Sequence, residues 1–323
     1  MSDLLKSIDA RTRLAGTNKL EILLFSLGTD ARTGRRETFG INVFKVREVM
    51  RTPPITAAPE MPPSVQGMVS LRGALVPVVD LARYAGVATD TPRSIMIVTE
   101  YAGHTQGFLV EGVDTILRLD WSQMRVPPAM LLAEMGGLVT AVTELPDGRL
   151  VMMMDVEKVL SETTGYDDEI VYRNIKPIGN SGLTVFFADD SAVARKQIRR
   201  TLEAMGVKYV STINGREAWE ELEKMADYAQ ASGQAVTELI SLVLTDIEMP
   251  EMDGYILTKK VKSDPRFAGV PVIMHSSLSG MSNQQLGKSV GVDEYVPKFE
   301  PQRLSETLAR RLRHELPAVG QLT

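Results

Sequence analysis

The 323-residue chain contains no cysteine, which excludes disulfides, thiolate metal sites and cysteine nucleophiles. We expect a cytoplasmic protein, because this composition fits a reducing compartment. An excess of basic residues is also lacking, since the formal net charge is -5, and this disfavours nucleic acid as a partner. Residues 1–13 carry charges throughout, and apolar runs such as 151–154 are far too short to span a bilayer. We therefore expect neither secretion nor direct membrane insertion.

The length predicts two domains of roughly 100 to 170 residues each, because 323 residues exceed what one compact core usually occupies. After a lead segment at 1–19, residues 20–160 show short apolar or alternating runs broken by Gly and Pro, a pattern typical of β-barrels. Arg72-Gly73 and Asp147-Gly148 each separate two such runs and predict hairpins. Short helices are expected to interrupt the strands, at 45–50, 81–84 and 156–160.

Residues 161–182 contain an acidic run, a proline and a Gly-Asn-Ser-Gly tail, and we interpret them as a linker. If fully flexible, this linker would reach roughly 25 Å root-mean-square, enough for the domains to dock or separate. From 183 to 312 the expected strands and helices alternate, which predicts a parallel sheet in an α/β doubly wound, flavodoxin-like domain. Residues 313–323 are expected to form a tail.

Polar side chains follow successive strands of the predicted parallel sheet. Asp189 and Asp190 follow the first strand, and Asp246 follows the third. Ser276 and Lys298 end two later strands. Because ligands bind at the carboxyl ends of strands in such sheets, we expect these groups to converge. Clustered carboxylates repel one another unless a cation is present, and an all-oxygen set with open positions suits Mg²⁺.

Phosphoryl transfer is the chemistry that this set of groups favours. The lysine and the hydroxyl could neutralise charge on the equatorial oxygens, and Asp246 is the expected nucleophile. Taken singly, an Asp pair before a helix is usually a cap, a serine at a strand end is usually a turn residue, and a lysine is usually solvated. Their joint occurrence in one repeating unit favours the site.

The second half of the chain resembles response-regulator receiver domains. The matching stretches are VFFADDS at 185–191, LTDIEMPEMDG at 244–254, PVIMHSS at 271–277 and YVPK at 295–298. The resemblance implies that Asp246 takes a phosphoryl group from a histidine kinase. It also implies that Asp189, Asp190 and Asp246 hold Mg²⁺, with the backbone carbonyl of Glu248 completing the site.

Three further roles follow from this resemblance. Ser276 matches the switch hydroxyl, Lys298 the phosphate-pairing lysine, and Tyr295 the aromatic residue that changes rotamer on activation. One departure is Phe299, which stands where the family usually has a proline. This departure leaves the conformation of that loop open.

The first half contains no nucleophile–base pair, no phosphate-binding glycine loop and no clustered metal ligands, and the three histidines of the chain are scattered. We expect a binding module and not an enzyme. Arg72 stands out, because a charged side chain on a hairpin tip is solvated and available to a partner. On local sequence alone, an ordinary solvated turn residue is the favoured interpretation.

The first half resembles the CheW family of chemotaxis coupling domains. The matching stretches are TFGINVFKVREV at 38–49, GMVSLRGALVPVVDL at 67–81 and LVEGVD at 109–114. The resemblance implies an all-β double barrel that bridges the cytoplasmic tips of chemoreceptors to the histidine kinase CheA, with CheW as a further candidate partner. It places Val46, Glu48 and Arg72 at or near the receptor-binding groove. The order of coupling domain, linker and receiver is similar to that of CheV-type proteins.

Our hypothesis is a cytoplasmic adaptor, recruited to receptor arrays and tuned by phosphorylation of Asp246. One alternative is a phosphate sink that drains the kinase with little coupling role. Another is a phosphatase of the haloacid-dehalogenase type, but that chemistry needs a second aspartate two residues after the nucleophile, where Glu248 stands.

Overall fold

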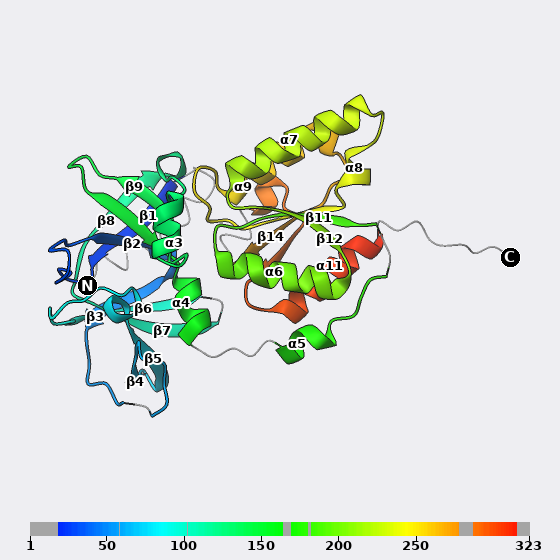
Figure 1. Cartoon of the computed structure of the whole chain (residues 1–323). Coiled ribbons are helices and arrows are strands. Elements are labelled where there is room, and N and C mark those ends of the chain that lie inside the picture. Colours follow the sequence, from blue (N-terminus) through cyan, green and yellow to red (C-terminus); the bar gives the residue numbers. More distant parts are fainter. Residues whose placement is uncertain are drawn as a thin grey trace. The chain divides into compact units, whose positions relative to one another are not determined.

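The computed structural model of the chain describes residues 19–57, 59–101, 103–163, 169–179, 182–277 and 287–314. The lead segment expected at 1–19 and the tail expected at 313–323 lie almost wholly outside the described residues. The chain divides into two compact units, one from Lys19 to Tyr166 and one that contains everything from Asp167 onward (Figure 1). Within the described ranges, no helix is both long and apolar enough to cross a membrane.

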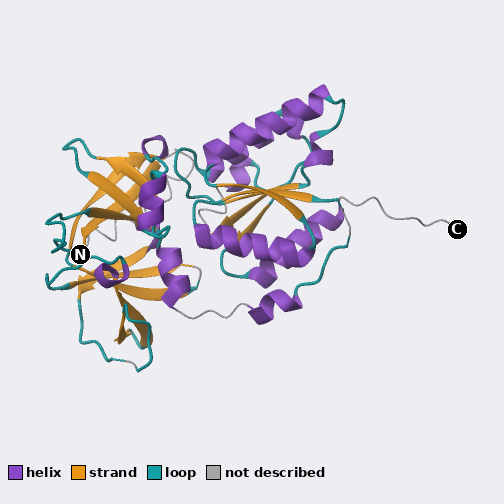
Figure 2. Cartoon of the chain, viewed as in Figure 1, coloured by secondary structure: helices purple, strands orange, loops and turns teal. Residues whose placement is uncertain are grey.

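Two five-stranded sheets build the first unit (Figure 2). The sheet with strand order β8-β1-β2-β10-β9 consists of β1 (Lys19–Ser26), β2 (Thr38–Asn42), β8 (Gly112–Asp120), β9 (Val139–Glu144) and β10 (Leu150–Met154). The sheet with strand order β3-β6-β7-β5-β4 consists of β3 (Val46–Arg51), β4 (Val65–Leu71), β5 (Ala74–Asp80), β6 (Ile95–Tyr101) and β7 (His104–Val110). Neighbouring strands pair antiparallel, except for the parallel pairs β2–β10 and β5–β7.

One backbone bridge closes each of these sheets. Arg125, which follows β8, exchanges two backbone hydrogen bonds of 2.9 and 2.8 Å with Val142 of β9, at the opposite edge. Thr56, which follows β3, exchanges bonds of 2.9 and 2.8 Å with Met68 of β4. Because closure pairs the two edge strands of a sheet, it turns each sheet into a small barrel. The predicted double barrel is confirmed.

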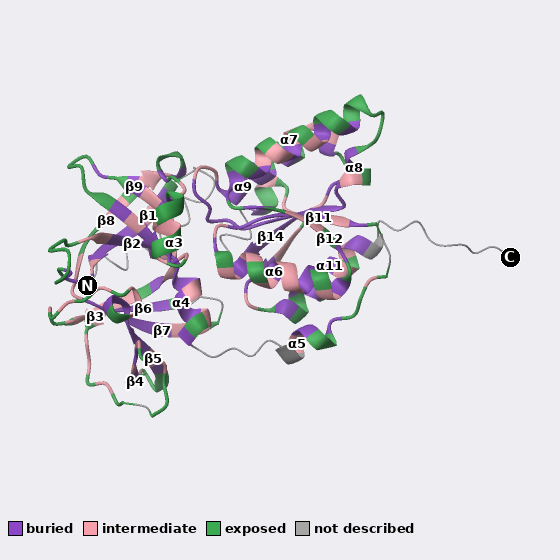
Figure 3. Cartoon of the chain, in the orientation of Figure 1, coloured by how far each residue is buried: buried purple, intermediate pink, exposed green. Residues whose placement is uncertain are grey.

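Strand β1 is apolar on both faces because each face packs into a hydrophobic cluster. Successive side chains of a strand point to opposite faces. Ile22 and Leu24 accordingly pack in the cluster inside the first barrel, whereas Leu23 and Phe25 pack in a larger cluster that draws on both barrels. Helix α4 (Val156–Thr163) contributes its apolar face to this shared cluster. The two barrels therefore form one folding unit with a common core. Figure 3 colours parts of several of these strands as buried.

The turns agree with the predicted hairpins, and one predicted helix is wrong. Arg72-Gly73 joins β4 to β5 with φ of 51° and 84°, the positive values of a type I′ turn, and Asp147-Gly148 joins β9 to β10. Helix α2 (Leu81–Tyr84) matches the expected one at 81–84. The helix expected at 45–50 is instead strand β3, because its β-branched residues pair with β6. Helix α3 spans Ala129–Glu134, and single 3₁₀ turns span Val43–Lys45 and Trp121–Gln123.

The second unit is a parallel sheet of order β12-β11-β13-β14-β15 with helices on both faces, as predicted. Its strands are β11 (Thr184–Ala188), β12 (Lys208–Thr212), β13 (Leu242–Thr245), β14 (Val272–Ser276) and β15 (Glu294–Pro297). One face is covered by α5 (Glu169–Asn174), α6 (Ala192–Met205) and α11 (Pro301–His314). The other is covered by α7 (Gly215–Ala231), α8 (Val236–Leu239), α9 (Gly254–Ser263) and a 3₁₀ turn at Pro265–Phe267. The helix expected at 281–290 lies mostly outside the described residues.

Part of the segment interpreted as a linker is folded. Within 161–182, α4 continues to Thr163 and α5 forms a second helix. Tyr172 and Ile175 are buried in the same cluster as the sheet and helices of the second unit. This differs from a fully flexible linker, because the apolar side chains of α5 and of the residue that follows it gain more by packing on the second unit than by remaining in water.

Candidate functional site

The acidic residues predicted from the strand ends come together at one edge of the parallel sheet. Asp189 follows β11 and Asp246 follows β13, which are neighbouring strands. Carboxylate oxygens of Asp189, Asp190 and Asp246 all lie within 4.8 Å of one another. The Nζ atom of Lys298, just after β15, lies 3.0 Å from Oδ2 of Asp189 and 2.9 Å from Oδ2 of Asp246. Three acids and one ammonium group therefore share one site.

Burial makes the charge balance of this site energetically important. Lys298 is 1% exposed, Asp189 0% and Asp246 4%. Charges removed from water need close partners of opposite sign. Three carboxylates against one ammonium group leave a negative excess, which a bound cation would neutralise. The described donor set is all oxygen and therefore fits Mg²⁺.

The Asp246 carboxylate is held by both of its oxygens. The backbone N–H of Ile247 donates to Oδ1 of Asp246 at 2.6 Å, and Lys298 donates to Oδ2 at 2.9 Å. The loop that follows passes so close that a Cβ atom on Gly254 would lie 1.9 Å from the carbonyl oxygen of Asp246. Only glycine therefore fits at position 254 with this loop in place.

Gly254→Ala is expected to destabilise the second unit by about 1–3 kcal/mol, because the added methyl group forces the backbone of Asp246 to move. Urea unfolding followed by circular dichroism measures this change. Gly112→Ala is the matched control, since nothing lies within 4 Å of its Cβ position. Equal stability of the two variants would contradict the close approach at Gly254.

Arg195 is a site residue that sequence reasoning missed. Its Nη1 atom donates to the backbone carbonyls of Asp189 and Asp190, at 2.8 and 2.9 Å. The backbone N–H of Ser191 donates to Oδ1 of Asp189 at 2.9 Å. Together these bonds orient the acidic pair. A signal was present, because a cation in the first turn of a helix opposes the helix dipole and needs another reason to be there.

Ser276 lies on β14 and Tyr295 on β15, the two strands that follow β13 in the sheet. Ser276 is buried at the end of β14, and its carbonyl accepts a hydrogen bond from the backbone N–H of Lys298 at 3.1 Å. The Tyr295 hydroxyl lies 3.5 Å from that of Tyr255, and a Cβ atom on Gly287 would lie 2.1 Å from it. The Tyr295 ring is therefore turned inward. Burial raises the pKa of both tyrosines, so both hydroxyls stay protonated at neutral pH.

Glu248 and Phe299 lie in the loops that follow Asp246 and Lys298. Glu248, two residues after Asp246, is buried. Phe299 adopts φ of 63°, a left-handed conformation that is unusual for a bulky side chain. The backbone after Lys298 therefore adopts a strained conformation at Phe299, and the described residues contain no cis peptide bond.

Two of the three predicted partner-binding residues meet on the surface of the first unit. The Nη2 atom of Arg72 lies 3.0 Å from Oε2 of Glu48, with side chains 69% and 28% exposed. Leu75, on the same hairpin, is 72% exposed. Val46 is buried in the shared core and offers little surface to a partner. The surface formed by Glu48, Arg72 and Leu75 is called the hairpin surface below.

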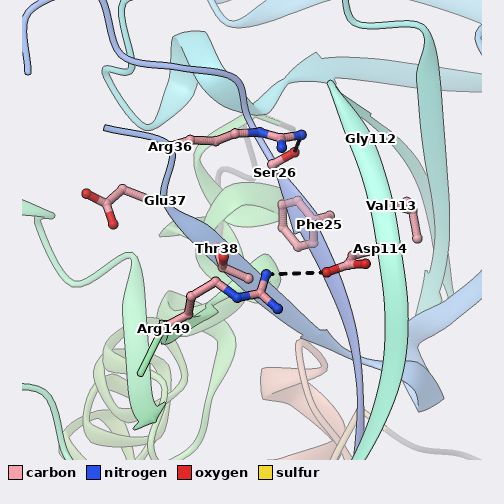
Figure 4. Close-up of a pocket in the computed structure, with 9 residues that line it drawn as sticks. All are labelled: Phe25, Ser26, Arg36, Glu37, Thr38, Gly112, Val113, Asp114 and Arg149. Carbon is pink, nitrogen blue, oxygen red and sulfur yellow. Dashed lines mark hydrogen bonds and ion pairs between the residues drawn. The ribbon is translucent and has the colours of Figure 1, made fainter. Parts of the chain in front are cut away.

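A pocket of about 370 Å³ opens at one end of the first barrel (Figure 4). Three of its charged groups take part in ion pairs: Arg149 lies 3.5 Å from Asp114, and Arg36 lies 2.8 Å from Glu111. It contains none of the site residues predicted from sequence. Its lining is formed by Phe25, Ser26, Arg36, Glu37, Thr38, Gly112, Val113, Asp114 and Arg149.

Comparison with known proteins assigns both units. Residues 21–164 match the model of the CheW-like domain, and residues 185–309 match that of the response regulator receiver domain. Chemotaxis protein CheV3 of Helicobacter pylori is 29% identical over 282 residues, which cover 85% of this chain and 88% of that protein. This chain belongs to the CheV type of chemotaxis coupling protein.

Single-domain relatives support the same assignment for each half of this CheV-type chain. Chemotaxis protein CheY1 of Helicobacter pylori is 36% identical over 128 residues, covering 39% of this chain and 94% of that protein. Chemotaxis protein CheW of Klebsiella aerogenes is 31% identical over 154 residues, covering 46% of this chain and 87% of that protein. These findings favour a signalling adaptor over an aspartyl-nucleophile phosphatase.

Proposed function

We propose that this CheV-type chain couples the cytoplasmic tips of chemoreceptors to the histidine kinase CheA through its first unit, and that phosphorylation of Asp246 tunes this coupling. The protein would then work in the cytoplasm at membrane-associated receptor arrays. The observation that carries the proposal is the oriented carboxylate of Asp246, held by Ile247 N–H and Lys298 inside a buried acidic cluster.

Phosphorylation on Asp246 would proceed by displacement. A carboxylate oxygen of Asp246 forms a bond to phosphorus, while the bond from phosphorus to the histidine nitrogen of the donor breaks and its electrons stay on that nitrogen. Lys298 would pair with the phosphoryl oxygens, and the Ser276 hydroxyl, at the end of β14, would donate to them. Asp189, Asp190, Asp246 and the carbonyl of Glu248 would hold Mg²⁺, which when bound neutralises charge on the phosphoryl oxygens.

The phosphoryl group would change the contacts of two residues. Lys298 bonds to both Asp189 and Asp246 in this structure, and a phosphoryl group on Asp246 offers it a stronger anionic partner. Ser276, at the end of β14, and Tyr295, on β15 just before Lys298, would move with this change. A difference of about 1–3 kcal/mol between the two states is the usual size of such a coupling.

The test is kinase activity in reconstituted arrays of receptor membranes, CheA and this protein, measured with and without a phosphodonor for Asp246. The expected result is that coupling depends on the phosphodonor for wild type and not for Asp246→Asn. Coupling that ignores the phosphodonor in both proteins would rule the switch out. If phosphoryl flow to competing regulators then rose in Asp246→Asn, the phosphate-sink function would be favoured instead.

Arg72→Asn is expected to raise the stability of the first unit and to weaken receptor binding. Arginine at φ of 51° occupies a turn position that favours Asn or Gly, so the change is expected to stabilise the first unit by about 1 kcal/mol. Loss of an exposed ion pair to Glu48 offsets little of this gain. Receptor binding is expected to weaken about tenfold, equivalent to about 1.4 kcal/mol, if Arg72 anchors the receptor.

Thermal unfolding and receptor-membrane sedimentation measure the two effects. Arg149→Asn is the matched control, because Arg149 is a half-exposed arginine beside the other hairpin of the same unit. Unchanged receptor binding by Arg72→Asn would remove the hairpin surface from the proposed interface.

A further inference from the structure

Helix α5, on the path of the chain between the two units, is built into the receiver. It contacts both α6 and α11. Tyr172 is 7% exposed and Ile175 is 6% exposed, both within the cluster formed by the sheet, α6 and α11. The Cζ atom of Arg200, on α6, lies 4.1 Å from the centre of the Tyr172 ring. The backbone N–H of Ile178 donates to the carbonyl of Met205, at the end of α6, at 2.9 Å.

The two helices under α5 both begin at the phosphorylation site. Helix α6 starts directly after the acidic pair, and Arg195 in its first turn binds the carbonyls of that pair. Helix α11 starts three residues after Lys298. Its Arg311 donates to Glu294 of β15 at 2.9 Å, so α11 is tied to the strand that directly precedes Lys298. Helix α5 therefore packs on two helices that begin next to groups of opposite charge in one site. The acidic pair precedes α6, and Lys298 precedes α11.

We propose that the face formed by α6 and α11 is the docking site of the chain's own α5, and that this docking is coupled to phosphorylation of Asp246. The inference rests on the proposed function, because it names how the same site is read out. In the structure, α5 is docked while Lys298 bonds to Asp189 and Asp246. Movement of Lys298 toward a phosphoryl group shifts α11, whereas Arg195 keeps the start of α6 at the acidic pair. Phosphorylation therefore loosens α5.

Two consequences follow for partners and for energetics. While α5 is docked, it covers the α6–α11 face and denies that face to other proteins. Coupling between two sites is reciprocal, so a ligand that loosens α5 must bind more tightly to a variant in which α5 is already loose, and by the same factor. This equality gives the proposal two independent readouts.

The first readout is amide hydrogen exchange of the full chain, with and without Mg²⁺ and fluoroberyllate as an analogue of the phosphoryl group on Asp246. Exchange in α5 is expected to accelerate at least about fivefold on binding, the lower end of typical coupling. The second readout is fluoroberyllate affinity by fluorine NMR. Tyr172→Ala is expected to bind more tightly by the same factor, whereas Tyr172→Phe, which keeps the ring, should match wild type.

Tyr228→Ala is the matched control, because Tyr228 is 62% exposed on α7, which lies on the opposite face of the sheet. Its fluoroberyllate affinity should equal that of wild type. If fluoroberyllate protects the segments around Asp246 but leaves α5 exchange and the Tyr172→Ala affinity unchanged, the docking inference is overturned and the proposed phosphorylation stands. If fluoroberyllate does not bind at all, both are overturned.

Discussion

Magnesium-dependent phosphorylation by acetyl phosphate is expected to fall more than about a hundredfold in Asp246→Asn, because a neutral amide cannot act as the nucleophile. Borohydride reduction followed by mass spectrometry locates the modified residue in wild type and variant. The variant is expected to remain folded, since losing one carboxylate relieves repulsion from Asp189 and Asp190 while Lys298 keeps its bond to Asp189.

Asp253→Asn controls for nonspecific damage to the same loop. Asp253 caps α9 by accepting from the backbone N–H of Ile256 at 2.7 Å, and asparagine caps a helix equally well. This variant is therefore expected to keep phosphorylation. Modification that persists in Asp246→Asn would mean that another residue is the acceptor. Wild type that takes no phosphoryl group at all would leave only a constitutive coupler.

Lys298→Met is expected to destabilise the receiver by about 3–5 kcal/mol in the absence of Mg²⁺. The reason is that Asp189 and Asp246 would stay buried without the cation that now lies about 3 Å from both. Added Mg²⁺ is expected to restore more stability to the variant than to wild type, because the ion no longer competes with the ammonium group. Urea unfolding with and without Mg²⁺ measures both effects.

Lys262→Met is the control for this prediction. Lys262 pairs with Asp293 at 2.6 Å, but the two side chains are about a third exposed, so the loss is expected to stay within about 1 kcal/mol. If Lys298→Met were equally mild and Mg²⁺ added nothing, the lysine would not be compensating buried charge, and the acidic cluster would be solvated instead.

Some features of the fold and the site could not be predicted from local sequence patterns, because they depend on contacts between distant segments. The stretch 45–50 has the pattern of a short helix, yet it is strand β3, because pairing with β6 decides the conformation of β-branched residues in a short segment. Val46 matches a partner-binding position but is buried in the shared core. Arg195 was missed because its partners are backbone carbonyls, so its unfavourable place near the start of a helix was the one pointer to it.

The sequence by itself determined which residues stand at the ends of the parallel strands, since alternation of apolar strands and amphipathic helices is a local pattern that survives folding. That pattern alone assigns Asp189, Asp190, Asp246 and Lys298 to one edge of the sheet. Only the tertiary structure decided that single bridges close both barrels, that Glu48 meets Arg72, and that α5 packs on α6 and α11. These contacts join segments distant in sequence, and their energy depends on the shape of the surfaces that folding brings together.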